Sequence, residues 1–423
     1  MKIWLLAAVA AFGMTLAGWD TGIVASAMAT LTGEFALSPA AQGMVVAVAL
    51  CGAAMGSFLC GRLTRAFGAR RTIIGLGCAY AALALASSMA PSFAALLACR
   101  LGIGLVFGAT AVVPVYVAEI ARPEKRGAMV SFAAIYTALA ILLAYLAGKA
   151  IIDAGGGWRS MLATGTVPGL LTALGLWALP ESPRQLLAWG QDAHARRVSR
   201  YLGLDALAIS GDTPPAGVTP LPWRQMFARP VLGLVLVGIG TTFFQQASGI
   251  NAVLYFAPRL FAGAAGVNGQ MAATIGIGLI NLLATLVATV LVDRAGRRSL
   301  LLWGTAIMDL LLVATALGFW IGAPIGVLAL LLCGFVAAYA IGLGAVPWIL
   351  LSEVYPLPLR ERAIGLAVLT LWGTNLMVTG AFPALASALG AAGSFLLFAA
   401  LSALGVAFIC WCVPETRGRT LGE

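Results

Sequence analysis

Long apolar stretches alternate along the chain with short breaks that are rich in charged residues, glycine or proline. A transmembrane helix needs about 20 mostly apolar residues to cross the ~30 Å hydrocarbon core of a bilayer. Twelve stretches reach that length, at residues 3–29, 40–60, 72–90, 93–118, 128–148, 160–179, 231–257, 268–292, 299–321, 325–351, 363–386 and 392–413. The pattern therefore predicts an all-α membrane protein with 12 transmembrane helices.

The composition excludes a water-soluble protein. Apolar residues make up 61% of the 423 residues, and only 9% are Asp, Glu, Lys or Arg, whereas a soluble domain averages about 25% charged. The seven cysteines lie inside apolar stretches, and the single histidine, His194, lies in a polar linker. This pattern gives neither a disulfide framework nor a cluster of metal ligands, so we expect no cofactor.

The basic residues mark one side of the membrane. With twelve spans, both termini and every second break between spans lie on the same side of the membrane. Of the 25 Lys and Arg residues, 21 fall on that side. The positive-inside rule makes this side cytoplasmic. The net charge of +10 is therefore a topology signal, and we expect no nucleic-acid partner.

The two halves of the chain carry matching landmarks. These are Glu119 with Arg126 and Glu353 with Arg360, and P-E-S at 180–182 with P-E-T at 414–416, each set separated from its match by 234 residues. The longest polar stretch, residues 181–229, separates six spans from six. We therefore predict an N-terminal six-helix bundle over residues 1–180, a cytoplasmic linker with short helices over 181–229, and a C-terminal six-helix bundle over 230–423. Parallel repeats of this kind place a binding site between the halves near the bilayer midplane, which is typical of alternating-access transporters.

The charged landmarks have two interpretations. They could be helix caps and topology signals, or they could form ion pairs at the cytoplasmic mouth that are made when it closes and broken when it opens. The predicted cytoplasmic gate consists of Glu119, Arg126, Glu353, Arg360, Asp293, Arg294, Arg297, Arg298, Arg70, Arg71, Glu181, Arg184, Glu415 and Arg417.

Three ionisable residues lie inside the predicted spans, where charge is costly and marks candidate functional sites. Asp20 in the first span and Arg100 in the fourth can neutralise each other. They form either a static ion pair or a proton-coupling site in which the carboxyl alternates between a paired anion and an unpaired acid. Asp309 in the ninth span has no evident partner. It is protonated or hydrogen-bonded in the bundle, or it faces a water-filled crevice; a second proton site is a further alternative.

The seventh span carries several amides and a candidate break. On an unbroken helix Gln245, Gln246 and Asn251 could not converge, because Asn251 would lie roughly 240° around the helix from Gln245. A break near Ser248-Gly249 would bring the amides together. Amides donate and accept hydrogen bonds without charge, as paired sugar hydroxyls require. The alternative is ordinary hydrogen bonding between helices.

Several short motifs occur in both halves of the chain. They are D-R-A-G-R-R at 293–298, P-V-Y-V-A-E at 114–119 with Arg126-Gly127, P-E-S-P-R at 180–184, Q-Q at 245–246 with G-I-N at 249–251, and P-E-T-R-G-R at 414–419. In combination they resemble the sugar porter branch of the major facilitator superfamily. The resemblance implies the major facilitator fold and the transport of a monosaccharide or polyol. Bacterial proton symporters and facilitative glucose carriers are the nearest types.

The resemblance also implies site residues. Asp20 and Arg100 match the acid and arginine of proton-coupled members, and Asn281, Trp348 and Asn375 join Gln245, Gln246 and Asn251 in lining the sugar cavity. Four positions depart from the family pattern: Ala134, Ile141 and Leu371 stand where members often carry amides, and Arg65 replaces an acid in the first arginine-rich turn. The departures in the spans indicate a substrate preference that is either different from xylose or looser. The departure at Arg65 indicates that one side of the cytoplasmic latch is weaker or relies on another acid, such as Glu119.

These observations predict a transporter and no enzyme activity. The expected function is import of a monosaccharide, a hexose in the first instance, with a proton by alternating access. The alternatives are a proton-independent sugar or polyol uniporter and, from another class, a sugar-sensing receptor. We expect a monomer that spans the bacterial inner membrane many times, with lipid, a sugar and a proton as its partners.

Overall fold

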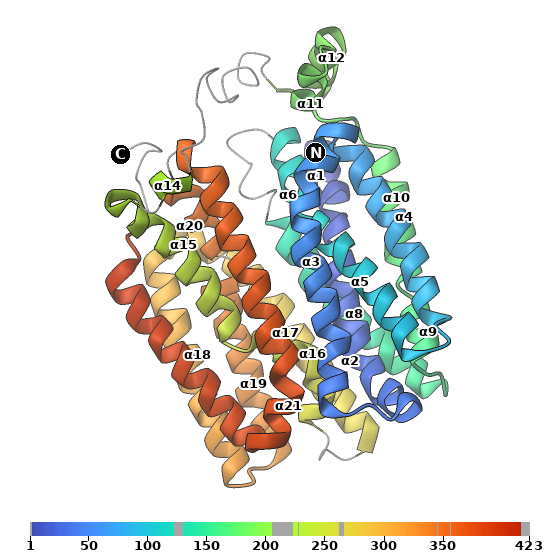
Figure 1. The fold of residues 1–423 in the computed structure, drawn as a ribbon, viewed down its shortest axis with the longest axis vertical. Helices are drawn as coiled ribbons and strands as arrows, with labels where there is room; N and C mark the ends of the chain where they lie inside the picture. The colour runs from blue at the N-terminus through green and yellow to red at the C-terminus, as the bar shows by residue number, and fades with distance from the viewer. Residues whose placement is uncertain are drawn as a thin grey trace. The chain divides into compact units, whose positions relative to one another are not determined.

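The structure is a computed structural model that describes residues 2–121, 129, 131–204, 223–226, 228–261, 266–344, 346–355 and 357–415. Figure 1 shows that the described residues form helices joined by short connections, and no strand occurs among them. The chain divides into two compact units: Met1–Leu31 with Val48–Gly217, and Thr32–Ala47 with Val218–Glu423. The all-α membrane class predicted from the apolar stretches is confirmed.

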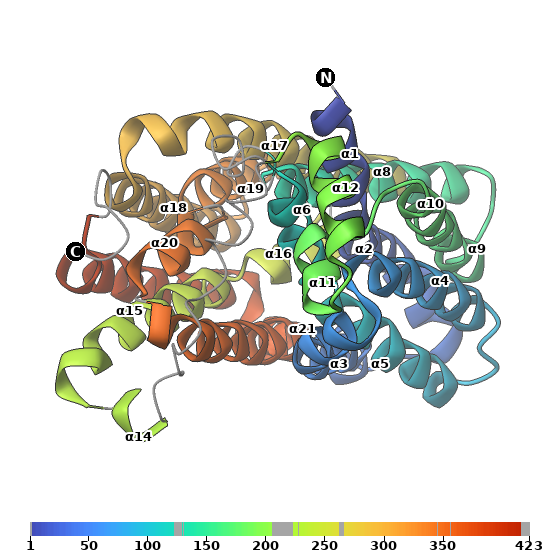
Figure 2. The same cartoon turned by 90° about the horizontal axis from the view of Figure 1, so that it is seen from above.

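The first unit contains the helices of the N-terminal half, except the end of the first span and the start of the second, which lie in residues 32–47 of the second unit. They are α1 (Lys2–Ala11), η1 (Phe12–Met14), α2 (Thr15–Phe35), α3 (Pro39–Phe67), α4 (Ala69–Ser88), α5 (Phe93–Ala109), α6 (Val112–Ile120), α8 (Phe132–Asp153), α9 (Trp158–Ala163), α10 (Thr166–Trp177), α11 (Pro183–Ala188) and α12 (Asp192–Leu202). The last two belong to the predicted linker and lie at one end of this unit, at the top in Figure 1 and toward the viewer in Figure 2. His194 is exposed on α12.

The second unit contains the helices of the C-terminal half. They are α14 (Trp223–Met226), α15 (Arg229–Ala247), α16 (Ile250–Leu260), α17 (Gly266–Ala295), α18 (Arg297–Trp320), α19 (Ile325–Tyr339), the π-helix η3 (Ala340–Gly344), α20 (Val346–Val354) and α21 (Leu357–Cys412). Several crossings are therefore built from two or three helices with a local break between them.

Eleven candidate membrane spans occur in the described parts of the chain. The last of them, Arg362–Cys412, is 51 residues long, about twice what one crossing needs. Gly390 lies inside it with φ 71° and ψ 174°, a backbone conformation that interrupts the helix. Because Gly390 falls in the break predicted between residues 386 and 392, the eleven segments accommodate the twelve predicted spans.

Close packing of α3 on α5 relies on small residues. A Cβ added at Gly104 would meet the backbone of Ala49, and one added at Gly52 would meet the backbone of Leu101 and Gly104. In lipid the hydrophobic effect does not drive helices together. Their association therefore relies on van der Waals packing, which small residues at the contact make closer. This packing fixes α5, the helix that carries Arg100.

The segment 32–47 belongs to the second unit, although the predicted boundaries at residues 180 and 229 place it in the first bundle. Arg259 Nη1 donates a hydrogen bond of 2.5 Å to Gln42 Oε1, and the Gln42 side chain is 8% exposed. Gly43 packs on the backbone of Gly380 so closely that a Cβ would collide with it. These contacts depend on residues far apart in sequence, which hydropathy does not reveal.

Candidate functional site

A buried ion pair joins α2 to α5 in the first unit. Arg100 Nη1 donates a hydrogen bond to Asp20 Oδ1, and the residues are 0% and 2% exposed. The second oxygen, Asp20 Oδ2, is buried and has no hydrogen-bond partner among the described residues. The structure therefore brings together two of the three intramembrane ionisable residues that the sequence singles out.

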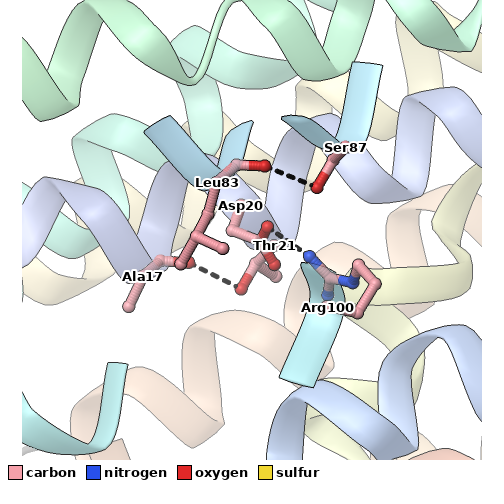
Figure 3. Close-up of polar contacts among 6 residues, drawn as sticks. All are labelled: Ala17, Asp20, Thr21, Leu83, Ser87 and Arg100. Atoms are coloured by element: carbon pink, nitrogen blue, oxygen red, sulfur yellow. Dashed lines mark hydrogen bonds and ion pairs between the residues drawn. The ribbon is translucent and has the colours of Figure 1, made fainter. Parts of the chain in front are cut away.

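The hydroxyl groups beside this pair are occupied within their own helices. Ser87 Oγ of α4 donates to Leu83 O at 2.7 Å, and Thr21 Oγ1 donates to Ala17 O at 3.0 Å (Figure 3). Removing two charges from water costs several kcal/mol per ion, roughly, and their mutual attraction offsets this only while they stay paired. The contact itself fits both interpretations of the sequence, a static ion pair and a proton-coupling site.

The seventh span is broken where the sequence predicts. Helix α15 ends at Ala247, Gly249 adopts φ 80° and ψ 10°, and α16 begins at Ile250. This left-handed conformation favours glycine, and the Phe398 ring packs where a Cβ of Gly249 would lie. Across the break, Asn251 Nδ2 donates a hydrogen bond of 2.6 Å to Gln246 Oε1. The predicted break, and the approach of two of the amides, are confirmed.

Gln245 is held by the π-helix of the tenth span. Its Nε2 donates a hydrogen bond of 2.6 Å to the Leu343 carbonyl in η3. The Tyr339 phenol approaches the same amide, yet Gln245 Oε1 is buried and has no well-formed hydrogen bond with any described group. An unsatisfied buried acceptor is costly, and a donor from a ligand would relieve that cost.

The π-helix and Tyr339 were not predicted. Single-turn π-helices frequently occur at functional sites because they shift the register of the following residues. The available signal was the glycine pair at 342 and 344 within the tenth span. Gly342 packs against Gly304 of α18, where a Cβ would lie 2.9 Å from the Gly304 Cα, so this span also needs a small residue there.

The other predicted cavity residues lie on three helices of the second unit. Asn281 of α17 is 8% exposed, Asn375 of α21 is 4% exposed, and Trp348 of α20 is 48% exposed. Asn375 Oδ1 accepts a hydrogen bond of 2.8 Å from Thr379 Oγ1. Within the described residues no hydrogen bond joins these three side chains to the amides of the seventh span.

Two residues of the predicted gate cap a helix within the first unit. Glu181 Oε1 accepts hydrogen bonds from the backbone N–H groups of Arg70 at 3.0 Å and Ser182 at 3.1 Å. The carboxylate thus satisfies an orphan donor in the first turn of α4 and complements the helix dipole. The Arg70 guanidinium donates to the carbonyls of Leu176 at 3.0 Å and Trp177 at 2.5 Å, the end of the sixth span.

The second unit repeats this arrangement. Glu415 Oε1 accepts a hydrogen bond of 3.2 Å from Arg297 N in the first turn of α18, and Arg298 Nη2 donates to Cys410 O at 2.7 Å. Cys410 is 234 residues after Leu176, the offset that separates the sequence landmarks. Within each unit these contacts are helix caps, as the first interpretation of the charged landmarks predicts. The ion-pair gate stays a prediction.

The remaining gate residues are placed only in part. Arg71 and Arg294 are exposed, and Glu119 and Arg184 are half-buried. Arg126 and Arg417 lie outside the described residues, and no side chain is described for Asp293, Glu353 or Arg360.

Asp309 and the positions that depart from the family pattern have varied surroundings, and Ala134 and Arg65 are exposed. Asp309 Oδ1 on α18 is buried without a hydrogen-bond partner among the described residues, as is Thr305 Oγ1 one turn earlier. Ile141 is buried where α8 meets Gly22 of α2, and Leu371 is buried on α21. Among the described residues no group of three His, Cys, Asp or Glu side chains could hold a metal ion.

Comparisons with known proteins agree with this architecture. The family model described as "Sugar (and other) transporter" matches residues 6–423. The putative metabolite transport protein YwtG of Bacillus subtilis is 33% identical over 98% of this chain and 92% of its own length. The glucose transporter GlcP of Staphylococcus epidermidis is 33% identical over 99% of this chain and 96% of its own length.

A solved structure extends the similarity to the fold. The inward open conformation of the xylose transporter XylE from E. coli superposes with a TM-score of 0.86 at 28% identity, covering 100% of this chain and 98% of that one. The family resemblance carried by the sequence motifs is thereby confirmed. This chain therefore belongs to the sugar porter family of the major facilitator superfamily, and it is a transporter rather than an enzyme.

Proposed function

We propose that this protein imports a monosaccharide, with a hexose as the expected substrate, together with a proton by alternating access. The observation that carries the proposal is the Asp20–Arg100 pair. Asp20 is a buried acid, and one proton on its carboxylate would release its partner Arg100. Relatives named for such coupling support it: the arabinose-proton symporter of Bacillus subtilis is 29% identical over 99% of this chain. A solved structure titled as the proton:xylose symporter XylE has a TM-score of 0.82.

The sugar is expected to bind at the broken seventh span. Gln245 Oε1 offers an unsatisfied acceptor, and the Gln246–Asn251 pair offers further amide groups that can donate and accept. Sugar hydroxyls fit such groups because each hydroxyl is both a donor and an acceptor. We assign Asn281, Asn375 and Trp348 to the same site, the indole serving as an apolar platform for the ring.

The proton is expected to bind at Asp20. While the carboxylate is charged, its attraction to Arg100 holds α2 against α5. Protonation removes the charge and weakens the hydrogen bond between Asp20 and Arg100. The conformation in which α2 and α5 are held together is then less favoured in free energy relative to the other conformation. Coupling follows when sugar and proton favour the same conformation of the transporter.

The remaining assignments extend the same proposal. The two six-helix bundles are residues 1–180 and 230–423, with the linker 181–229 between them in sequence. The gate residues form ion pairs at the cytoplasmic mouth in one conformation. The protein acts as a monomer in the lipid bilayer of the bacterial inner membrane, with both termini cytoplasmic.

Proton flux in de-energised vesicles tests this function. Adding a hexose outside vesicles that contain the transporter should make a weakly buffered medium more alkaline, because each sugar entering carries a proton with it. A screen of hexoses, pentoses and inositols by thermal shift selects the sugar, and vesicles without the protein serve as the control. Sugar entry without a pH change would identify a uniporter. A sensor would show ligand binding without counterflow.

Replacing Trp348 by alanine should weaken sugar binding while the protein stays folded. Trp348 is 48% exposed, so its loss leaves no large cavity in the protein core. An aromatic contact of this kind contributes about 0.5–1.5 kcal/mol, so the affinity should fall roughly two- to twelvefold. Calorimetry on the purified protein measures the change. Trp303→Ala, at an exposed tryptophan of α18, is the matched control, and undiminished affinity in Trp348→Ala would exclude the contact.

A further inference from the structure

Three consecutive residues of α2 meet three different neighbours. On a helix successive side chains point about 100° apart. Gly18 faces α8, Trp19 reaches the junction of α9 and α10, and Asp20 pairs with Arg100 of α5. The orientation of the Asp20 carboxylate is therefore tied to contacts on two other sides of the same helix.

The glycine side sets how closely α2 approaches α8. A Cβ added at Gly22 would lie 2.7 Å from the Ile141 carbonyl oxygen, and one added at Gly18 would lie 3.0 Å from the Ala140 Cβ and closer still to the Thr137 carbonyl oxygen. Neither position accepts a side chain without displacement. These contacts fix the distance between the two helices. Rotation of α2 about its axis is restrained by polar contacts, among them the hydrogen bond of 3.4 Å that Thr137 Oγ1 of α8 donates to Met14 O just before α2.

A hydrogen bond on the tryptophan side opposes that rotation. Trp19 Nε1 donates to Thr164 Oγ1 at 3.2 Å, across 145 residues of sequence. The Thr164 hydroxyl in turn donates to Met161 O at 2.6 Å, which orients its oxygen as an acceptor for the indole. Thr164 is one of the two residues between α9 and α10, so the bond connects the first span to the junction of these helices in the sixth.

We propose that Trp19 and Thr164 are a positioning pair that sets the rotation of α2 and thereby directs Asp20 at Arg100. The inference rests on the proposed role of Asp20 in proton coupling. Side-chain tips lie roughly 5 Å from a helix axis, so a rotation of about 20° moves a tip by roughly 2 Å, enough to break a hydrogen bond. The indole N–H thus controls how long the ion pair persists without touching either charge.

Arg100 is the charged side chain that meets Asp20 in the described structure. Other ionisable groups lie on the surrounding helices: Lys149 pairs with Asp153 at 2.7 Å on α8, Tyr136 of α8 contacts Phe12, Arg159 of α9 lies 4.2 Å from the Trp158 ring centre, Tyr80 of α4 lies beside Gly165, and Tyr145 of α8 is buried. A shift in the pH dependence of uptake is therefore assigned to the Asp20–Arg100 pair only if Asp20→Asn removes it.

Two substitutions remove this bond from opposite ends. Thr164→Val deletes the acceptor and keeps the shape, and Trp19→Phe deletes the donor and keeps an aromatic ring. A neutral hydrogen bond contributes about 0.5–1.5 kcal/mol, so either change should alter the proton concentration for half-maximal uptake roughly two- to twelvefold. The midpoint should move to higher pH, since a looser α2 lets the proton compete better with Arg100. The double variant should shift no further than either single one.

Two controls separate positioning from general damage. Thr164→Ser retains the hydroxyl and should restore the wild-type pH profile. Thr166→Val removes a hydroxyl two residues away, one that donates to Ala81 O at 3.5 Å, and should leave the profile unchanged. Counterflow at saturating sugar, which requires a folded carrier, should persist in every variant.

Each outcome is decisive. Wild-type pH profiles in Thr164→Val and Trp19→Phe, with Asp20→Asn uncoupled, would overturn the positioning role and leave the proton site standing. Equal shifts in Thr164→Val and Thr166→Val, or no rescue by Thr164→Ser, would also overturn it. Full uphill accumulation by Asp20→Asn would overturn the proton site itself, and the positioning role with it.

Discussion

Asp20→Asn should abolish uphill sugar accumulation, so that internal and external sugar concentrations become equal, while sugar counterflow continues. Asparagine has nearly the shape of the acid and can still accept a hydrogen bond from Arg100, but it neither binds nor releases a proton at physiological pH. Asp20 is the proposed proton site, and it is 2% exposed and paired with Arg100. Uptake into energised vesicles measures accumulation.

The control for this prediction is Asp153→Asn. Asp153 is an exposed acid of the same unit that pairs with Lys149 at 2.7 Å, and its loss should leave accumulation intact. Removing one member of a buried ion pair can destabilise a protein by about 3–5 kcal/mol, and for this reason counterflow must be measured on the same preparation. Asp20→Asn vesicles that still concentrate sugar against its gradient would rule out the coupling role.

Gln245→Leu should produce the largest loss of sugar affinity among the amide substitutions. The change removes the buried acceptor Oε1, and it leaves the Leu343 carbonyl of the π-helix without its donor. A site built to hydrogen-bond a hydroxyl loses roughly 1–3 kcal/mol when one partner is deleted, which is about a 5- to 150-fold increase in Kd. Calorimetry with the sugar identified by the thermal-shift screen measures it.

Thr315→Val is a matched control for the loss of a buried polar group. Thr315 of α18 is fully buried, and its hydroxyl donates to Leu311 O at 2.7 Å within its own helix. Both variants should remain folded, and only Gln245→Leu should bind sugar weakly. If the two variants bound with the same affinity as the unmodified protein, Gln245 could not be a sugar ligand.

Periodicity and residue chemistry predict the features that depend on local sequence. The twelve apolar stretches follow from the length that a helix needs to cross a bilayer, and the break in the seventh span follows from Gly249 between amides that an unbroken helix would separate. The pairing of Asp20 with Arg100 could be inferred because opposite charges in lipid seek each other.

Other features depend on contacts that sequence patterns do not encode. Glu181 reaches the first turn of α4 across 111 residues, so hydropathy could not separate a helix cap from a gate. The π-helix in the tenth span, which places the Leu343 carbonyl against Gln245, shifts the backbone register without changing the apolar character of the span. The Trp19–Thr164 bond is likewise visible only once the first and sixth spans are packed together.

The arginine contacts at Leu176 and Cys410 repeat in the two halves and indicate that the chain arose by duplication. Duplication of an ancestral six-helix unit would give two copies of every structural device. The two copies have kept the same arginine clamp and the same carboxylate cap at matching helix ends. Inside the apolar spans they have diverged: the first copy carries the buried ion pair of Asp20 with Arg100, and the second carries the buried amides Gln245 and Gln246, the latter bonded to Asn251.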